Sequence, residues 1–393
     1  MKKQFVCILV LLMTLSFVFG CAKPKTTAVV TQDSQVYIVG GGIAGLAAAV
    51  FAIRDGNIPG KNVHILEQMN FMGGAMDGIA DPANGYKSRG ARLINEKRYT
   101  CYWNLLASIP SLADQEEIMK EGQKIENPIK YIPKKSVKDE IYEFNQSGKH
   151  KLNAAYSRIW GLNQKRLDSS TWTISWKDRW NLVKLIVWES EKDTSGKRIS
   201  DYMSPAFFKS HFWYMFSAMF GFDPWHDLTE FKRYLHRFID DLDDLASLTR
   251  EGWNTPYENY YSVILPIVKW LQYNGVDFQY GCKVYDVDFK PSQTEKTIEK
   301  LYYRQNGEEK TITLKNGDFA IMSIGSKVAD SSLGTMDTTA ELIRDKRDGS
   351  WILWENMAKK QPDVMGHPET FNSNINECKW VVWSLTSKSK FLY

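Results

Sequence analysis

Residues 35–49 read QVYIVGGGIAGLAAA, and this stretch decides the fold of the N-terminal part of the chain. Gln35 to Val39 is a short run typical of a β-strand, and Ile43 to Ile53 has the alanine-rich pattern of a helix. Lys61 to Leu66 (KNVHIL) is a second strand-like run. Strand, helix and strand in this order predict a β-α-β unit, and therefore a parallel sheet.

Six residues at the start of the helix, Gly40-Gly41-Gly42-Ile43-Ala44-Gly45, fit the pattern G-x-G-x-x-G. The first glycine permits a tight turn, the second lets the backbone approach a pyrophosphate, and the third lets helix and strand pack closely. Free N–H groups at the helix start would face the anion. The pattern favours an adenine dinucleotide site over the alternative, a glycine-rich turn without a ligand.

Two further features follow the second strand. Glu67 comes 22 residues after Gly45, where a carboxylate can accept hydrogen bonds from a ribose. Gly73 and Gly74 provide another place where the backbone can approach a ligand. Together they favour a flavin over a nicotinamide cofactor.

The composition narrows the class of protein. A chain of 393 residues and 45.3 kDa indicates a large enzyme or a two-domain protein. With 43% apolar and 24% charged residues, it resembles neither a disordered nor a multi-span membrane protein. A formal net charge of +4 argues against a nucleic-acid binder. The six histidines are scattered, and the sequence holds neither C-x-x-C nor H-E-x-x-H, so we predict no metal site.

The first 20 residues are predicted to be a signal peptide, because two lysines precede a nearly continuous apolar run. Val18-Phe19-Gly20-Cys21 resembles a bacterial lipobox, so we expect Cys21 to carry lipid and to anchor the protein on the extracytoplasmic side of the cell membrane. An ordinary signal peptide is the alternative. Residues 21–34 would form a flexible tether. Of the other cysteines, Cys101, Cys282 and Cys378 allow at most one disulfide.

The rest of the chain divides by composition. We assign 35–112 to the first part of the dinucleotide-binding domain and 113–152, which is rich in charge, to a polar surface insertion. Residues 153–256, with seven tryptophans between Trp160 and Trp225, are expected to form an all-helical domain. Strand-like runs at 276–289, 300–314 and 318–324 indicate a return to the first domain over 257–335, and 336–393 form the C-terminal segment.

Several segments of the chain resemble the oleate hydratase family, also called the myosin-cross-reactive antigen family. The most specific are Ser108–Leu112 (SIPSL) and Phe212–Phe238, in which PWH is followed by KRYLHRF. The other matching stretches are Tyr37–Ala49, Arg54–Gly56, Gly73–Gly74, Arg89–Arg92, Ile264–Leu271 and Phe278–Gly281. The similarity extends from about residue 35 to the C-terminus.

The resemblance implies an α/β fold. It would consist of a Rossmann-like FAD-binding domain with a parallel sheet, an added antiparallel or mixed sheet, and a helical substrate or cap domain. The implied activity is the addition of water to a cis double bond of a free unsaturated fatty acid such as oleate, with FAD undergoing no net redox change. The implied FAD contacts are Gly40, Gly42, Ala44, Gly45, Glu67, Gly73, Gly74, Arg89 and Val284.

The same resemblance assigns the reacting groups. Tyr234 matches the family's proton donor, the alternative being an ordinary core aromatic residue. The family's water-activating glutamate follows R-G-G-R, but here Leu93 occupies that place and Glu96 is the nearest carboxylate. Asn259 takes the place of a glutamine near the fatty-acid channel.

Two features keep other functions open. Leu93 cannot accept a proton, and family members extend beyond the segment that ends here at Tyr393, so an inactive fatty-acid or flavin-binding remnant is one alternative. A flavin-dependent oxidoreductase of the amine-oxidase type is another, because it shares the glycine turn. We also expect either a homodimer or a complementing C-terminal fragment as partner.

Overall fold

The structure is a computed structural model. It describes residues 30–76, 78–81, 85–88, 94–95, 99–120, 133–147, 159–160, 165–167, 171–239, 253–291, 296–324, 330–345, 349–373, 375–377 and 381. The predicted signal peptide, Cys21, Arg89, Leu93, Glu96 and Cys378 lie outside these residues. The structure therefore does not test the roles predicted for these residues.

A four-stranded parallel sheet forms the centre of the first domain. Strand β1 (Val36–Val39) pairs with β2 (Val63–Leu66) on one side and with β11 (Phe319–Met322) on the other, and β7 (Asp277–Gln279) pairs with β2. The order is β11-β1-β2-β7, with every pairing parallel. Helix α2 (Ile43–Arg54) connects β1 to β2, so the predicted β-α-β unit is confirmed.

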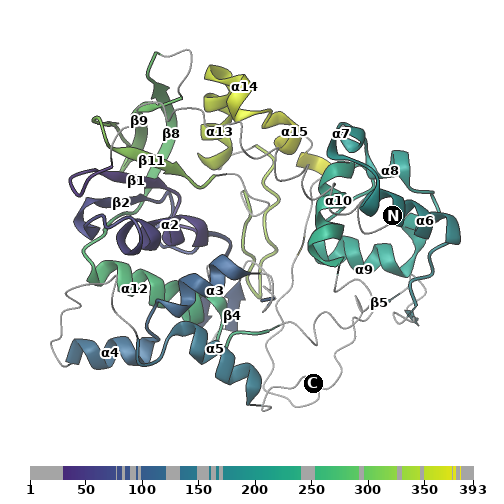
Figure 1. Cartoon of the computed structure of the whole chain (residues 1–393), viewed down its shortest axis with the longest axis horizontal. Coiled ribbons are helices and arrows are strands. Elements are labelled where there is room, and N and C mark those ends of the chain that lie inside the picture. Colours follow the sequence, from purple (N-terminus) through teal and green to yellow (C-terminus); the bar gives the residue numbers. More distant parts are fainter. Residues whose placement is uncertain are drawn as a thin grey trace, which may run out of the picture.

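Helices cover one face of this sheet (Figure 1). They are α2, α3 (Thr100–Ala107), α5 (Val137–Gln146) and α12 (Leu265–Tyr273), and their apolar side chains share one core with the strands. Helix α4 (Leu112–Lys120) lies beside them. A short antiparallel hairpin, β3 (Gly78–Asp81) with β4 (Gly85–Ser88), follows the second glycine segment in the chain.

The expectation that 113–152 is a surface insertion is wrong for α5. Val137 and Ile141, one helical turn apart, are fully buried in the core of the first domain. Ser136 and Asp139 form a capping box that fixes the start of this helix. The charged residues around these two apolar positions conceal them in the sequence, because a helix needs only one apolar face to pack.

A three-stranded antiparallel sheet stands beside the parallel one. Its order is β10 (Glu308–Thr313), β9 (Ile298–Gln305) and β8 (Cys282–Phe289), and helix α13 (Gly349–Lys360) packs on β8. Val39 and Leu66 of the parallel sheet share a core with Val287 and Leu301 of this sheet. The chain continues into α14 (Pro362–Met365) and α15 (Glu369–Asn372). The strands predicted between 276 and 324 are confirmed, and the fold is α/β with an added antiparallel sheet.

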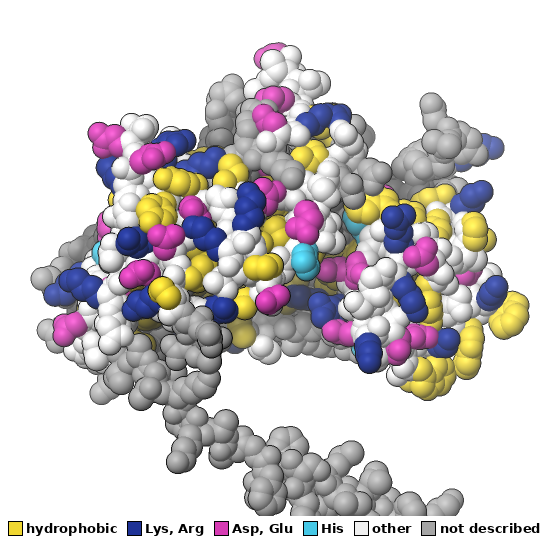
Figure 2. All heavy atoms as spheres, turned by 90° about the horizontal axis from the view of Figure 1, so that it is seen from above, with side chains coloured by type: hydrophobic (Ala, Val, Ile, Leu, Met, Phe, Trp, Pro, Cys, Tyr) yellow, Lys and Arg dark blue, Asp and Glu magenta, His cyan; other side chains and the backbone are white. Residues whose placement is uncertain are grey.

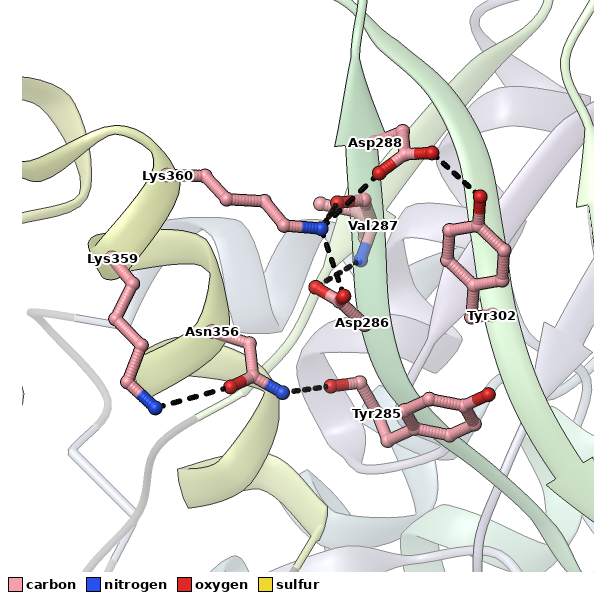
Figure 3. A network of polar contacts seen from close by, with 8 residues as sticks. All are labelled: Tyr285, Asp286, Val287, Asp288, Tyr302, Asn356, Lys359 and Lys360. Atoms are coloured by element: carbon pink, nitrogen blue, oxygen red, sulfur yellow. Dashed lines mark hydrogen bonds and ion pairs between the residues drawn. The ribbon is translucent and has the colours of Figure 1, made fainter.

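Polar contacts attach α13 to this sheet (Figure 3). The Lys360 ammonium donates to Asp286 Oδ2 at 2.8 Å, to Val287 O at 2.7 Å and to Asp288 Oδ1 at 3.2 Å. One turn earlier, Asn356 Nδ2 donates to Tyr285 O at 2.8 Å. Helix α13 therefore covers the strand on which the predicted FAD contact Val284 lies.

Helices make up most of a second body with its own core, at the right of Figure 1. The elements are α6 (Trp176–Val187), α7 (Glu191–Thr194), α8 (Ile199–Tyr202), α9 (His211–Phe220) and α10 (Leu228–Arg237). Two-residue strands β5 (Ile159–Trp160) and β6 (Arg166–Leu167) pair antiparallel, so the region is not all-helical as expected. No helix within the described residues is long and apolar enough to cross a bilayer.

Candidate functional site

Two glycines of the turn after β1 are required by the fold itself. Gly40 has a φ of 99°, and a Cβ there would lie 2.5 Å from the carbonyl oxygen of Ser323. A Cβ on Gly45 would lie 1.9 Å from the carbonyl oxygen of Gly40. Both contacts are far below van der Waals distance, so these positions admit only glycine if strand, turn and helix are to keep their places.

Gly42 differs, because the described part of the protein does not require a glycine there. It is the N-cap of α2 with a φ of −72°, which any residue can adopt. A Cβ on Gly42 would have Gly74 Cα as its nearest described neighbour, at 3.8 Å, an ordinary contact. Ala44, in the first turn of α2, is exposed. The helix start therefore presents a backbone surface free of side chains, which is the surface that a pyrophosphate needs.

The second glycine segment is hydrogen-bonded to the first. The Gly73 amide donates to the Gly41 carbonyl at 2.9 Å, and Gly42 and Gly73 form a parallel bridge. Gly74 has a φ of 53°, and a Cβ there would come within 3.0 Å of Gly42 Cα. The two segments, which the sequence suggested as separate places of close approach, form one continuous backbone surface. We call this surface the glycine cradle.

The Glu67 side chain holds the glycine cradle in place through hydrogen bonds to backbone amides. Its side chain is buried, with Oε2 accepting from the Gly41 amide at 2.7 Å and Oε1 from the Met69 amide at 2.8 Å. A carboxylate oxygen has more than one acceptor direction, so a ribose hydroxyl could donate to the same group. The hydrogen bond from the Gly41 amide to this carboxylate also fixes the orientation of the turn between β1 and α2. The arrangement fits the dinucleotide role that the sequence predicts for Glu67.

Val284 lies on β8, the strand whose Cys282 amide donates to the Glu67 carbonyl at 2.8 Å. Its side chain is buried in the core shared by the two sheets, in register with Tyr303 on β9. Any contact between this residue and a cofactor would therefore have to be made by its main chain. The neighbouring Cys282 is also buried, and burial raises the pKa of its thiol to about 12, so it is an inert packing residue.

Tyr234 lies on α10, half-buried against three aromatic rings. The ring centroids of Phe222 and Phe220 lie 5.1 and 5.4 Å from its own, and that of Phe238 lies 6.1 Å away. Within the described residues no hydrogen bond involves its hydroxyl group. Burial, with the charge of Glu230 as a smaller cause, raises the pKa of Tyr234, so the phenol is protonated at neutral pH. The phenol therefore has a proton to donate, although the raised pKa makes it a weaker acid than a free tyrosine.

Residues that sequence reasoning missed lie between Tyr234 and the first domain. The Arg237 guanidinium stacks over the ring of Tyr99 at 5.3 Å from its centroid, joining α10 to the start of α3. From Tyr99 a row of ring contacts continues through Tyr102 and Trp103 to Trp253. No spacing in the sequence signals the contact of Arg237 with Tyr99, since the two residues are more than 130 positions apart.

Asn259 stands at the start of an unusual helical segment. Residues Tyr260–Ile264 form a π-helix that continues into α12, and Asn259 is its N-cap. The Oδ1 atom of Asn259 is buried and has no hydrogen-bond partner among the described residues. A buried amide oxygen without a partner is costly, and π-helical segments occur often at functional sites. This position fits a polar group of a ligand, as the family resemblance implies.

These features define a class of protein, an α/β protein with a glycine-rich turn of the dinucleotide-binding type and a helical body that carries Tyr234. No group of metal-binding side chains occurs in the part of the chain that the structure describes. The chain belongs to the MCRA family, whose model matches residues 33–393. The family was expected from the resemblance of its motifs, and this expectation is confirmed.

Two relatives point to the same family. The chain is 34% identical to the oleate hydratase of Streptococcus pyogenes serotype M49 (strain NZ131) over 361 residues, 92% of this chain and 57% of that protein. It is 29% identical to the linoleate hydratase of Lactiplantibacillus plantarum over 380 residues, 91% of this chain and 62% of the relative. The chain thus spans about three fifths of the length of these relatives.

The solved structures are more distant. Cyclohexylamine oxidase from Brevibacterium oxydans IH-35A is 14% identical, with a TM-score of 0.44 over 76% of this chain and 59% of that chain. A likeness of this size carries no conclusion about the function of the chain.

Proposed function

We propose that the chain binds FAD in the glycine cradle and adds water to a carbon–carbon double bond of a free unsaturated fatty acid. The observation that carries this proposal is the Tyr234 phenol, which lies half-buried among aromatic rings and has no hydrogen bond among the described residues. The hydratase names of the two relatives support the choice of reaction.

The chemistry needs an acid and a base on opposite sides of the bond. Tyr234 would deliver its proton to one alkene carbon, and water would add to the neighbouring carbon while losing a proton to a base. The apolar rings of Phe220 and Phe222 around Tyr234 suit a hydrocarbon chain and exclude competing water. The phenolate left behind would regain its proton from the solvent.

FAD, when bound, would shape the site and supply local charge without net redox change. In this chain its pyrophosphate would lie at the start of α2, against the backbone of Gly42 and Gly74. The Glu67 carboxylate, fixed by the Gly41 and Met69 amides, would accept from the ribose. Arg89 is proposed as a further contact from the family resemblance.

The group that takes the proton from water must differ from that of the family, because Leu93 stands where the family has glutamate. Glu96 is the proposed substitute. A second candidate function, a fatty-acid and flavin-binding protein without catalysis, is favoured by Leu93 alone. A flavin oxidase would instead reduce its flavin with substrate.

The test is incubation of the full chain with FAD and oleate, followed by mass spectrometry of the products. Hydroxy acid supports the hydratase. Its absence from the natural chain but formation by Leu93→Glu would show an intact pocket that lacks only the base, which supports the non-catalytic candidate. Absence from both, with FAD bound, contradicts the proposed reaction.

A further inference from the structure

Helix α6 presents apolar side chains to the solvent along its outer face. Trp176, Trp180, Val183 and Val187 follow one another at intervals of four, three and four positions, so they form one stripe. Their exposed fractions are 82%, 56%, 42% and 62%. Trp188, at the C-cap, is 59% exposed and its ring lies 5.4 Å from that of Trp180. We call these five residues the α6 face.

The α6 face is not the result of a loosely attached helix. On the opposite side of α6, Leu182 and Leu185 are buried in the core of the helical body. Asp178 is fully buried and accepts hydrogen bonds from Ser175 and Ser204. The helix is therefore fixed by its inner side, while the bulkiest apolar residues point outward. In Figure 2 hydrophobic side chains protrude at the right-hand end, where α6 lies in Figure 1.

Cations border the α6 face on both sides. At helical spacing Lys177 and Lys184 lie along one edge of the stripe and Arg179 along the other. Lys184 forms an ion pair with Glu189, at 3.1 Å, while Asp178, the one carboxylate within α6, faces inward. The outer side of α6 therefore combines three exposed cations with apolar residues, and the helix itself contributes no exposed carboxylate.

We propose that the α6 face docks on an anionic lipid bilayer, with the helix lying in the plane of the interface. Tryptophan is enriched at the level of lipid headgroups, because its ring is apolar and its N–H is polar. Lysine and arginine beside such a stripe pair with lipid phosphates. A symmetric contact between two copies of this face would bring like charges together, which disfavours a second copy as the occupant.

Docking at this place would also orient the helical body. Helix α10 packs on the inner side of α6, where the Lys232 ammonium donates to Leu185 O at 2.9 Å and also to Glu189 O. Tyr234 lies two residues further along α10. If the proposed function holds, the face would place Tyr234 near the membrane in which a free fatty acid dissolves. The docking itself does not depend on that function.

Quenching by brominated lipid tests the proposal. The full chain is mixed with vesicles of phosphatidylglycerol and phosphatidylcholine in equal parts, with or without bromine on the acyl chains, and tryptophan emission is recorded. An acyl group on Cys21 would attach the natural chain and every variant to the vesicles equally. The measurement is therefore quenching of tryptophan emission and not the amount of protein bound to the vesicles. The variant is Trp176→Ser with Trp180→Ser. The control is Met336→Ser, which removes a 93% exposed apolar side chain elsewhere.

We expect the natural chain and the control to be quenched alike, and the double variant to lose most of the quenching. The circular dichroism spectrum should be unchanged, because both residues are exposed. Equal quenching in the natural chain and the double variant would overturn the proposal. So would a lipid-free dimer that the same two substitutions dissociate, because the face would then join two copies.

The charge requirement has its own test. Lys177→Glu reverses an exposed charge beside the stripe and should weaken binding to the anionic vesicles by roughly tenfold or more. The same substitution should leave binding to vesicles of phosphatidylcholine alone unchanged. Equal binding of the variant and the natural chain to anionic vesicles would contradict the part assigned to charge.

Discussion

A substitution at Gly42 best distinguishes an effect on folding from an effect on ligand binding. A methyl group at this position would contact only Gly74 Cα among described atoms, at 3.8 Å. Gly42→Ala should therefore keep its stability, within about 0.5 kcal/mol, yet weaken FAD binding by roughly tenfold or more, because the Cβ would occupy the place of the pyrophosphate. Flavin fluorescence titration and thermal unfolding measure the two effects.

Gly45→Ala is the matched control, because its Cβ would meet the Gly40 carbonyl at 1.9 Å. It should destabilise the protein by about 1–3 kcal/mol whether or not FAD is present. A Gly42→Ala variant that binds FAD as tightly as the natural chain would contradict the proposed cradle.

Tyr234→Phe removes the phenol and keeps the ring packed against Phe220 and Phe222. We expect hydration to slow by about 10²-fold or more, with little change in the melting temperature. Tyr202→Phe is the control, because this tyrosine packs against the same core and its hydroxyl donates to Glu189 at 3.3 Å. A rate that Tyr234→Phe leaves unchanged, with a shifted melting temperature, would make Tyr234 an ordinary core residue.

At this scale the sequence predicts some roles and misses others. The glycine pattern predicts a turn at Gly40 and close packing at Gly45, because both features depend on residues that are near in the sequence. The contact of Arg237 with Tyr99 was not predicted, since it depends on how two bodies of the chain meet. Nor could spacing alone reveal that Gly73 is hydrogen-bonded to Gly41.

Helix α6 depends on one buried carboxylate at its start. Asp178 Oδ2 accepts from Ser175 Oγ at 2.6 Å and from Ser204 Oγ at 2.7 Å, and Oδ1 accepts from the Ser204 amide at 3.1 Å. Burial alone would raise the pKa of Asp178, but these hydrogen bonds outweigh it and lower the pKa below its ordinary value of 3.8. The charged form thus stabilises the folded state above that pH, and the contribution is lost as the pH falls through the lowered pKa.

Asp178→Asn should therefore cost about 1–3 kcal/mol at neutral pH, because the amide nitrogen cannot accept these hydrogen bonds. The difference in unfolding free energy between the two proteins should shrink as the pH falls below about 3.8. Asp193→Asn is the control, since Asp193 has the same capping contact with Ser190 on an exposed helix. Its effect should be smaller, and an effect as large as that of Asp178→Asn would contradict the importance given to burial. Urea unfolding across pH measures both.

Among the elements, the sequence was most informative where the pattern was local and strong. The strands of the parallel sheet and helix α2 follow from short apolar runs and the glycine turn. Helix α5 was missed as a core element because only Val137 and Ile141 of its ten residues are buried. The pair β5–β6 was missed because two-residue strands have no pattern of their own.

For the whole molecule, the candidate site is divided between two bodies with separate cores. The glycine cradle belongs to the sheet domain, and Tyr234 belongs to the helical body, with Tyr99 and Arg237 in contact between them. Binding of FAD to the folded form alone should raise the melting temperature with FAD concentration. The same titration on Gly42→Ala should show a smaller rise, and an equal rise would place FAD elsewhere.

The central claim is tested most directly by the origin of the oxygen in the product. The full chain is incubated with FAD and oleate in water enriched in heavy oxygen, while the flavin spectrum is recorded. The account predicts a hydroxy acid that carries one heavy oxygen at the former double bond, with the flavin oxidised throughout. Bleaching of the flavin by the fatty acid, with a product that lacks the heavy oxygen, would contradict it.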